Sequence, residues 1–306
     1  MAGVTTRRVA GAGGVEIAAH HLGGDGPPVV IVHATGFHGR CYTRLAGSLT
    51  PEFSVWAVDQ RGHGWSGKDP DGRYDDWTRF AEDLLRVIDD VEPGAAWGAV
   101  GHSLGGGVAL LAEAVRPGSF SALCCYEPVV IPPNWLPAGG EQAHGGTSPV
   151  PLAVLARKRR PSFPSRRAAF DNYRSKPPFS AFDPRALHDY VEYGFVDQPD
   201  GSVTLACVRE DEAAVFEAAP GSGVWEHLPE VRTPVAVLAG ADLSDPVAAV
   251  AAQVARHLPR GGFRRFATLD HFGPLTAPAE VGAVVAAALR PRPDATRSTM
   301  GVTSRG

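Results

Sequence analysis

Gly101-His102-Ser103-Leu104-Gly105 is the stretch of this sequence that decides the fold. It reads G-x-S-x-G. The apolar residues 97–100 before it predict a buried strand, and residues 106–114 after it predict a helix packed on a sheet. A serine at such a strand-to-helix turn is held in a strained backbone conformation with its hydroxyl exposed. Glycines two residues before and after it remove the Cβ atoms that would collide as strand and helix approach each other. The pattern therefore predicts that Ser103 is a nucleophile.

Apolar strands and helices alternate along the first half of the chain. Continuous or alternating apolar runs predict strands at residues 15–21, 28–33, 55–59, 96–101 and 122–126. Between two of these strands, residues 76–91 repeat apolar side chains at the helical period. Strands that are apolar throughout and alternate with helices are typical of a parallel sheet covered on both faces. We therefore predict an α/β fold with a mostly parallel, doubly wound sheet.

The pattern changes after residue 130 and returns near residue 232. Residues 131–231 hold 13 of the 27 prolines and little strand pattern, which favours short helices joined by turns. Strands are then expected near 233–240 and 263–267, and helices near 247–257 and 279–289. We predict a core made of residues 1–130 and 232–290, an inserted helical cap or lid at 131–231, and a disordered tail at 291–306.

The composition is that of a globular protein and gives no sign of nucleic-acid binding or of a membrane span. The chain has 306 residues, of which 44% are hydrophobic and 20% charged, as in a globular protein with a sizeable core. A net charge of −4 gives no sign of nucleic-acid binding. No apolar run approaches the ~20 residues of a membrane span, and the N-terminus has no signal-peptide core. We therefore expect a cytoplasmic protein with neither nucleic-acid nor membrane partners. A homo-oligomer is compatible with the sequence, which does not determine the oligomeric state.

Cysteine and histidine spacing indicates neither a metal site nor a cofactor. The four cysteines have no metal-ligand spacing, and we expect them to be reduced. No predicted helix carries paired histidines with a nearby acid.

Four stretches give the chain a resemblance to a known family. They are Val32–Gly39 (VHATGFHG), Asp59–Ser66 (DQRGHGWS), Gly101–Gly105 and Asp270–Leu275 (DHFGPL). In this order and at these spacings the chain resembles the α/β-hydrolases, in the branch of serine esterases and lipases with a helical cap. The resemblance covers roughly residues 5–130 and 232–290. His33-Ala34 stands where this group usually has His-Gly, so we expect the loop after it to follow a slightly different path.

A serine hydroxyl needs a base that takes its proton as it attacks. His271 follows a predicted strand, in a loop expected beside the Ser103 turn at the carboxyl edge of the sheet, where ligands bind in open α/β sheets. We therefore predict His271 as the base. His33 and His63 are expected to brace their own loops through hydrogen bonds.

The third group is a carboxylate that orients the base and stabilises its charged form. Three candidates remain open. Asp242 is preferred, because its place after a strand and before Pro246, at its distance from His271, resembles the family's common arrangement. Asp245 would suit a longer loop. Glu127, at the end of the preceding strand, occupies a position that some members of the fold use.

The resemblance also implies an oxyanion hole. Its donors would be the backbone N–H of Leu104 and that of Thr35, with Gly36 as the alternative if Ala34 alters the loop.

The sequence indicates the substrate-contacting residues less specifically than the catalytic ones. The candidates that lie near predicted loop ends and could line an apolar pocket are Phe37, His102, Trp135 and Phe272. The basic stretch at residues 157–167 either attracts a carboxylate, a phosphate or a coenzyme A thioester, or is simply a solvated face of the lid.

Together these residues predict a serine hydrolase that needs no cofactor. Its small-molecule substrate would be a small or medium ester, thioester or lactone, cleaved through an acyl-enzyme. C–C bond hydrolysis, lyase or perhydrolase chemistry remains open, because the fold supports these reactions with similar residues. A non-enzymatic ligand receptor on the same scaffold also remains open.

Overall fold

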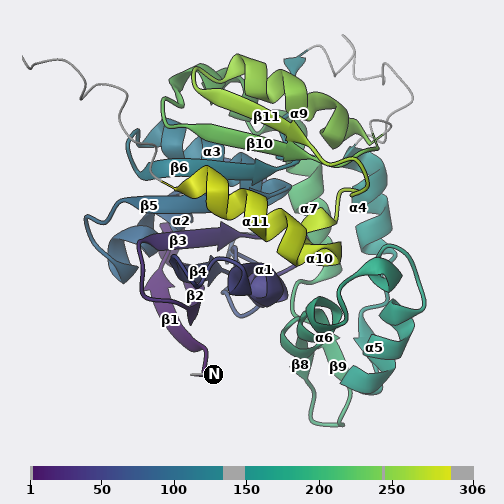
Figure 1. Cartoon of the computed structure of the whole chain (residues 1–306). Coiled ribbons are helices and arrows are strands. Elements are labelled where there is room, and N and C mark those ends of the chain that lie inside the picture. Colours follow the sequence, from purple (N-terminus) through teal and green to yellow (C-terminus); the bar gives the residue numbers. More distant parts are fainter. Residues whose placement is uncertain (1–2, 134–148, 243–244, 291–306) are drawn as a thin grey trace, which may run out of the picture.

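Figure 1 shows a computed structural model of the chain, which describes residues 3–133, 149–242 and 245–290. Eight strands of the described residues form one sheet: β1 (Thr5–Ala10), β2 (Glu16–Gly23), β3 (Pro28–Val32), β4 (Ser54–Val58), β5 (Trp97–His102), β6 (Phe120–Tyr126), β10 (Val235–Ala239) and β11 (Gly261–Arg265). Their spatial order is β1-β2-β4-β3-β5-β6-β10-β11.

The sheet is mostly parallel. All neighbours from β4 through β3, β5, β6 and β10 to β11 pair in parallel, whereas β1 pairs with β2 and β2 with β4 in antiparallel fashion. The predicted α/β fold class is thus confirmed. The strand pattern did not predict β1, an edge strand whose side chains are mostly exposed and therefore lack an apolar run.

Helices cover both faces of the sheet. On one face lie α2 (Trp77–Val91), α3 (Leu104–Val115) and α9 (Pro246–His257), and on the other lie α1 (Thr43–Gly47) and α11 (Pro278–Leu289). Side chains alternate between the two faces along each strand. In β3, Val30 packs in the core on the α2–α3 side, whereas Ile31 packs on the α1–α11 side. The neighbouring Cys124 and Cys125 of β6 divide in the same way, and both are buried free thiols.

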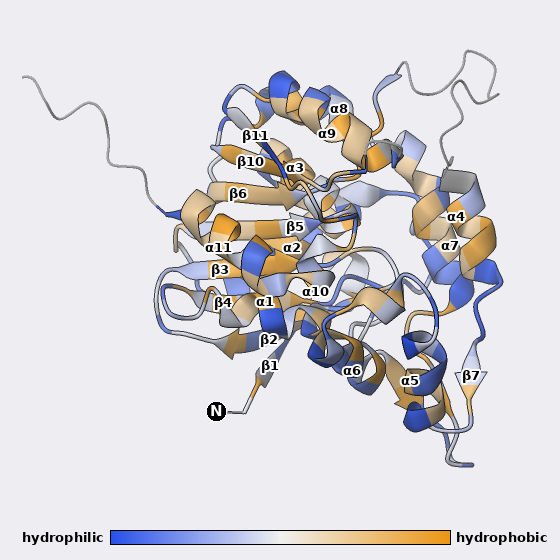
Figure 2. Cartoon of the chain, turned by 45° about the vertical axis from the view of Figure 1, so that its right-hand side comes forward, coloured by the Kyte–Doolittle hydropathy of each residue, from blue (hydrophilic) through white to orange (hydrophobic). Residues whose placement is uncertain are grey.

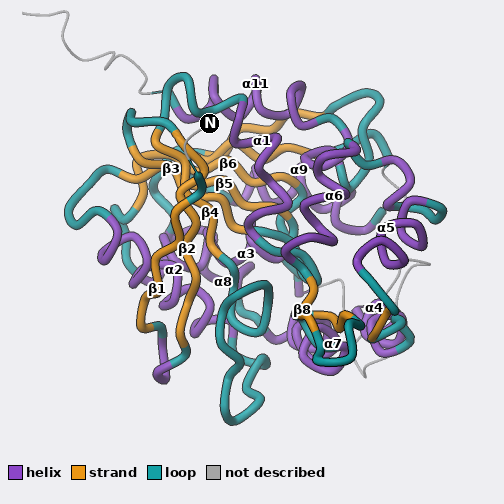
Figure 3. Tube along the Cα trace, turned by 90° about the horizontal axis from the view of Figure 1, so that it is seen from below, coloured by secondary structure: helices purple, strands orange, loops and turns teal. Residues whose placement is uncertain are grey.

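Residues 149–231 connect the described part of the chain after β6 to β10. This segment, here called the inserted region, contains α4 (Pro149–Arg157), α5 (Arg166–Arg174), α6 (Pro184–Tyr193), α7 (Arg209–Ala218) and α8 (Val224–His227). It also holds a three-stranded antiparallel sheet of β7 (Ser162–Phe163), β9 (Val203–Leu205) and β8 (Phe195–Asp197). The sequence did not predict these strands, because two or three residues are too few to show a period of two. Figure 3 shows α4, α5, α6 and α7 grouped to one side of the large sheet.

Short helical segments complete the described structure. They are α10 (Gly273–Thr276) and single 3-10 turns at Ala12–Gly14, Gly39–Tyr42, Phe179–Ala181, Ala219–Gly221 and Leu228–Glu230. Apolar residues gather in the central strands (Figure 2). Of the helices in the described ranges, none combines the length and apolar character that crossing a membrane requires. The predicted tail at 291–306 lies outside the described residues.

The parallel strands bring their carboxyl ends to one edge of the sheet. His33 directly follows β3, Ser103 follows β5 and Glu127 follows β6. In Figure 1 the arrowheads of β3, β5 and β6 point toward α4 and α7 of the inserted region. Residues far apart in the sequence therefore meet at this edge, beneath the inserted region.

Candidate active site

Ser103 occupies a strained turn between β5 and α3. Its φ is 55° and its ψ −118°, a conformation that costs a non-glycine residue about 1–3 kcal/mol. The flanking glycines allow the close approach that the turn needs. A Cβ on Gly101 would lie 2.5 Å from the carbonyl oxygen of Gly105, and a Cβ on Gly105 would collide with the carbonyl oxygen of Val32. The Ser103 carbonyl accepts the N–H of Val129 at 3.0 Å, which ties the turn to the segment after β6.

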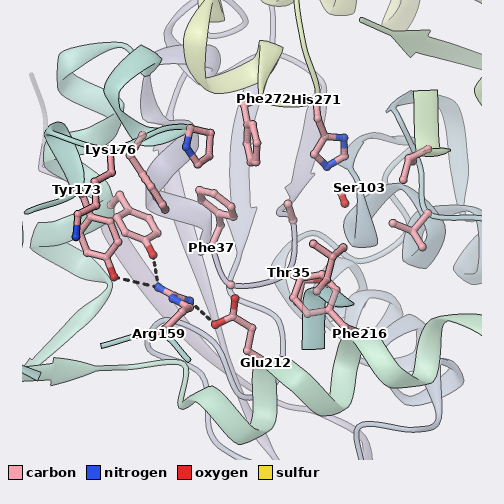
Figure 4. Close-up of a pocket in the computed structure, with 18 of the residues that line it drawn as sticks. Thr35, Phe37, Ser103, Arg159, Tyr173, Lys176, Glu212, Phe216, His271 and Phe272 are labelled. Carbon is pink, nitrogen blue, oxygen red and sulfur yellow. Dashed lines mark hydrogen bonds and ion pairs between the residues drawn. The ribbon is translucent and has the colours of Figure 1, made fainter. Parts of the chain in front are cut away.

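His271 is held by a buried carboxylate. Its Nδ1 lies 2.6 Å from Oε2 of Glu127, and the other oxygen of Glu127 accepts the N–H of Gly240 at 2.6 Å. An ionised carboxylate only accepts hydrogen bonds, so Nδ1 carries the proton and Nε2 keeps the lone pair. Figure 4 shows the His271 ring beside the Ser103 hydroxyl. No hydrogen bond joins these two side chains in the described part of the chain; such bonds are often long before substrate binds.

The carboxylate on His271 differs from the preferred sequence candidate. Asp242 is exposed in the loop after β10, and its carbonyl accepts the N–H of Asp245 at 3.3 Å. Glu127 supplies the hydrogen bond instead, so the preference for Asp242 is corrected. The reason lies in the backbone: Glu127 has a φ of 42° directly after β6, and its long side chain reaches the loop of His271.

Asp245, the remaining candidate, lies close to this pair. Its carboxylate accepts the N–H of Val247 at 2.8 Å and so caps the start of α9. One oxygen each of Asp245 and Glu127 and one ring nitrogen of His271 lie within 4.8 Å of one another. Asp245 thus adds negative charge beside the base without making the hydrogen bond to Nδ1.

The environment of His271 favours its protonated form. Burial lowers the pKa of His271, but the hydrogen bond and charge of Glu127, with the charges of Asp245 and Asp270, outweigh burial and raise it above the ordinary 6.5. A base with a raised pKa accepts a proton more readily, which suits general-base catalysis near neutral pH.

The two backbone N–H groups that the sequence suggested as oxyanion donors lack an acceptor among the described residues. Leu104 is the first residue of α3 and so has no carbonyl one turn earlier to which it could donate. Thr35 lies in the loop after β3 and lines the same cavity as Ser103. Among the hydrogen bonds of the described residues, neither N–H has an acceptor.

A cavity of about 700 Å³ connects these groups to the inserted region. Ser103 and His271 line one end of it (Figure 4). Apolar side chains line the adjoining walls, among them Phe37, Phe179, Phe216, Phe272 and Val247. The lining also carries the basic residues Lys158, Arg159, Arg160 and Lys176.

Residues 29–284 match the alpha/beta hydrolase family. The chain belongs to this family. Among curated relatives, the monoglyceride lipase of Homo sapiens is 33% identical over 110 residues, which are 34% of this chain and 35% of the lipase. The monoacylglycerol lipase of Mycolicibacterium smegmatis is 33% identical over 155 residues, 47% of this chain and 50% of that lipase. The matches therefore span between about a third and a half of these relatives' lengths.

Solved structures share the fold over nearly the whole chain. The structure of E-2-(acetamidomethylene)succinate hydrolase superimposes with a TM-score of 0.77 and 20% identity, covering 94% of this chain and 99% of that one. A thioesterase domain from the curacin biosynthetic pathway gives a TM-score of 0.72, 20% identity, and coverage of 92% and 99%.

The candidates for substrate contacts in this alpha/beta hydrolase have different positions. Phe37 and Phe272 line the cavity, with ring centroids 6.1 Å apart. Trp135 lies outside the described residues. His102 is buried and does not line the cavity, so its prediction as a substrate contact is corrected. The reason is that alternate residues of a strand point to opposite faces, and His102 ends β5 pointing beneath the site.

His102 instead supports the loop of the base. Its Nε2–H donates to the carbonyl oxygen of His271 at 2.8 Å, and its Nδ1 accepts from the hydroxyl of Tyr42 at 2.7 Å. The Tyr42 oxygen in turn accepts the N–H of Ala34 at 3.2 Å. Burial, together with the nearby His271, holds the pKa of His102 well below its usual range, so the ring stays neutral. This chain of bonds joins the loop after β3 to the His271 loop. No local sequence pattern indicated this role of Tyr42.

His33 and His63 brace their loops, as the sequence indicated. His33 Nδ1 lies 2.7 Å from the Ala34 carbonyl oxygen, and its Nε2 accepts the N–H of Gln60 at 2.9 Å. His63 Nδ1 lies 3.0 Å from the carbonyl oxygen of Arg61.

One group of potential metal ligands exists among the described residues: Glu127, Asp245 and His271. One polar atom of His271, both oxygens of Glu127 and one oxygen of Asp245 already have partners. Nδ1 of His271 donates to Glu127, the second Glu127 oxygen accepts from Gly240, and Asp245 caps α9. A cation bound through Nδ1 of His271 would have to replace the proton on that nitrogen. The arrangement therefore fits orientation of an imidazole better than coordination of a metal.

Proposed function

We propose that this alpha/beta hydrolase is a serine hydrolase that cleaves carboxylic esters, thioesters or lactones through an acyl-enzyme. One observation carries the proposal: Ser103, on its strained turn, faces the same cavity as a His271 ring that Glu127 fixes through Nδ1. The name lipase carried by the two curated relatives adds support.

In the first half of the reaction, the Ser103 oxygen attacks the carbonyl carbon while His271 Nε2 takes the hydroxyl proton. The carbonyl π electrons move onto oxygen, and the N–H groups of Leu104 and Thr35 stabilise that charge. Each such donor contributes about 3–4 kcal/mol. When the carbonyl re-forms, the bond to the leaving alcohol or thiol breaks, and His271 returns the proton to the leaving group.

In the second half, a water molecule attacks the acyl-serine while Nε2 takes its proton. The tetrahedral species collapses, the bond from the acyl carbon to the Ser103 oxygen breaks, and His271 protonates that oxygen. Glu127 stays ionised throughout and stabilises the imidazolium in both steps. We also propose that the inserted region acts as the cap that shields these steps from bulk water.

Replacement of the two reacting side chains tests the proposal. Ser103→Ala and His271→Ala are each expected to lower the hydrolysis of an ester, thioester and lactone panel by at least about 10³-fold. Ser175→Ala and His188→Ala, both at exposed positions of the inserted region, are the matched controls and should retain activity. Hydrolysis that survives Ser103→Ala would disprove the proposal.

Product analysis separates hydrolysis from other chemistry on this scaffold. A panel containing β-diketones and cyanohydrins reports C–C cleavage and lyase activity. Turnover confined to those compounds would replace the ester-hydrolase proposal. Tight ligand binding without any turnover would indicate a receptor.

A further inference from the structure

The cavity has an uneven distribution of charge. Glu127 and Asp245 flank His271 at its catalytic end. Figure 4 places Lys176 and Arg159 away from Ser103, with Phe37 lying between them and the nucleophile. Lys158 and Arg160 belong to the same lining. The cavity lining is therefore acidic beside His271, apolar around Phe37, and basic beyond Phe37.

Arg159 is already neutralised. It forms an ion pair with Glu212 and donates to the hydroxyl of Tyr173 at 3.3 Å; it also bonds the hydroxyl of Tyr190 (Figure 4). These contacts raise its pKa, although burial alone would lower it. This network packs against the loop after β3, because a Cβ on Gly36 would lie 2.5 Å from a Glu212 oxygen. Arg159 is therefore a structural part of the wall.

The other three cations of the lining have no carboxylate partner among the described residues. Lys176 donates to the side-chain oxygen of Asn172 at 2.7 Å. Arg160 donates to the carbonyl oxygen of Ser162 at 2.9 Å and lies over the ring of Phe163. Lys158 forms no ion pair with a described carboxylate. These three residues line the cavity from solvent-exposed positions and lack a carboxylate counter-charge among the described residues.

The rest of the basic stretch behaves differently. Arg157 pairs with Glu210 and Glu217, at distances of 3.0 and 2.6 Å. Arg166 pairs with Asp197, and Arg167 pairs with Asp171 at 2.8 Å. None of these three arginines lines the cavity. The stretch thus divides into arginines that are paired and lie off the cavity and into Lys158 and Arg160, which line the cavity and have no carboxylate partner among the described residues.

We propose that the substrate carries an anionic group, a carboxylate or a phosphate, at the end remote from the scissile bond, and that Lys158, Arg160 and Lys176 bind it. This inference rests on the proposed ester-hydrolase function and specifies its substrate class. The carboxylates beside His271 repel the anionic end while the cations attract it, so the charges also orient the substrate. Clefts lined by charge of one sign raise association rates by about 10- to 10³-fold.

Two matched substrate pairs test the proposal and identify the anion. Monophenyl suberate carries a carboxylate that its methyl ester, phenyl methyl suberate, lacks. Octanoyl-pantetheine 4′-phosphate carries a phosphate that octanoyl-pantetheine lacks. In at least one pair, kcat/KM for the anionic member should exceed that for the neutral member by about tenfold or more at low salt, and the excess should shrink as salt screens the cations.

A charge-matched pair of triple variants locates the effect. The cavity variant combines Lys158→Gln, Arg160→Gln and Lys176→Gln. The control combines Arg157→Gln, Arg166→Gln and Arg167→Gln, which removes the same net charge from outside the cavity. The preference for the anionic member should fall about tenfold in the cavity variant and stay near the wild-type value in the control.

The outcomes separate this inference from the proposed function. A preference in the first pair identifies a carboxylate, and one in the second pair a phosphate. Ratios near 1 in both pairs, or equal losses in the two triple variants, would overturn the inference while Ser103-dependent hydrolysis of the neutral members still stood. If none of these compounds is hydrolysed, their affinities for Ser103→Ala, measured by calorimetry, replace kcat/KM in the comparison of anionic and neutral members. Equal affinities within both pairs would then overturn the inference.

Discussion

Among the described residues other than glycine, Ser103 and Glu127 alone have a φ in the left-handed region, at 55° and 42°. Each directly follows a central parallel strand. Such conformations persist only where surrounding structure holds them, and they concentrate at functional sites. The strain thus falls on the proposed nucleophile and on the carboxylate that orients its base.

Glu127→Gln tests the identity of that carboxylate. The amide keeps the shape of the side chain but loses the charge that fixes the tautomer and stabilises the imidazolium. We expect kcat/KM to fall by about 10²- to 10⁴-fold. Asp242→Asn, at the exposed position that the sequence favoured, is the matched control and should stay within a few-fold of wild type. The reverse ranking of the two variants would assign the acid to Asp242.

The pH dependence of activity follows from the raised pKa of His271. The base works only when Nε2 is unprotonated, so kcat/KM should rise with pH and reach half its plateau above pH 6.5. Glu127→Gln removes the main cause that raises this pKa, so the acidic limb of the variant should move to lower pH. A pH series of kcat/KM on both proteins measures the shift. A limb that stays in place would show that another group titrates.

At the scale of elements, the loops after β3 and before α10 are joined beneath the nucleophile. Ala34 N–H, the Tyr42 hydroxyl, His102 and the His271 carbonyl form one hydrogen-bonded chain. The loop bearing Thr35 and the loop bearing the base are therefore held in one relative position. Errors of about 1 Å in such positions cost about 100-fold in rate.

Tyr42→Phe breaks this chain without removing a reacting group. We expect kcat to fall by about 10- to 100-fold with little change in KM, and stability to fall by about 1–3 kcal/mol because a buried nitrogen of His102 loses its donor. Tyr74→Phe is the control, since the Tyr74 hydroxyl is buried and accepts the N–H of Asp69 at 3.3 Å, away from the site. Equal kcat in the two variants would show that Tyr42 has only a structural role.

At the scale of the whole molecule, the buried side chain of Arg61 connects loops at the edge of the sheet to α2. Arg61 is fully buried and bonds Asp69 and Asp83, each at 2.7 Å. Its guanidinium also donates to the carbonyl oxygen of Ala12 at 3.0 Å. One side chain thus joins the loop after β4, the turn after β1 and α2.

Arg61→Met should lower the free energy of unfolding by about 3–5 kcal/mol, because the buried carboxylate of Asp83 loses its counter-charge. Asp69 keeps only Arg79, at 3.3 Å. Arg116→Met removes an exposed pair with Asp89 and should cost no more than about 1 kcal/mol. Urea denaturation of both variants measures the difference. Similar losses would show that the buried pair does not hold this part of the fold.

The sequence predicted those parts of the fold and of the site whose structure depends on a local sequence pattern. The strands, the Ser103 turn and the His271 loop each have neighbours in the sequence that indicate their structure. The pairing of His271 with Glu127 depends instead on a backbone reversal after β6 and on contacts between residues 144 apart in sequence. The bonds of Tyr42 and most of the division of the basic stretch are likewise tertiary features, because Arg157 and Arg166 pair with carboxylates on other elements.

The most direct test of the central claim is intact-mass spectrometry after reaction with a fluorophosphonate, which labels activated serines. We predict one adduct on the wild-type protein, located on Ser103 by peptide mapping. Ser103→Ala should form none, and His271→Ala should react at least about 100-fold more slowly. An adduct on another residue, or equal labelling rates in the wild type and His271→Ala, would contradict the account.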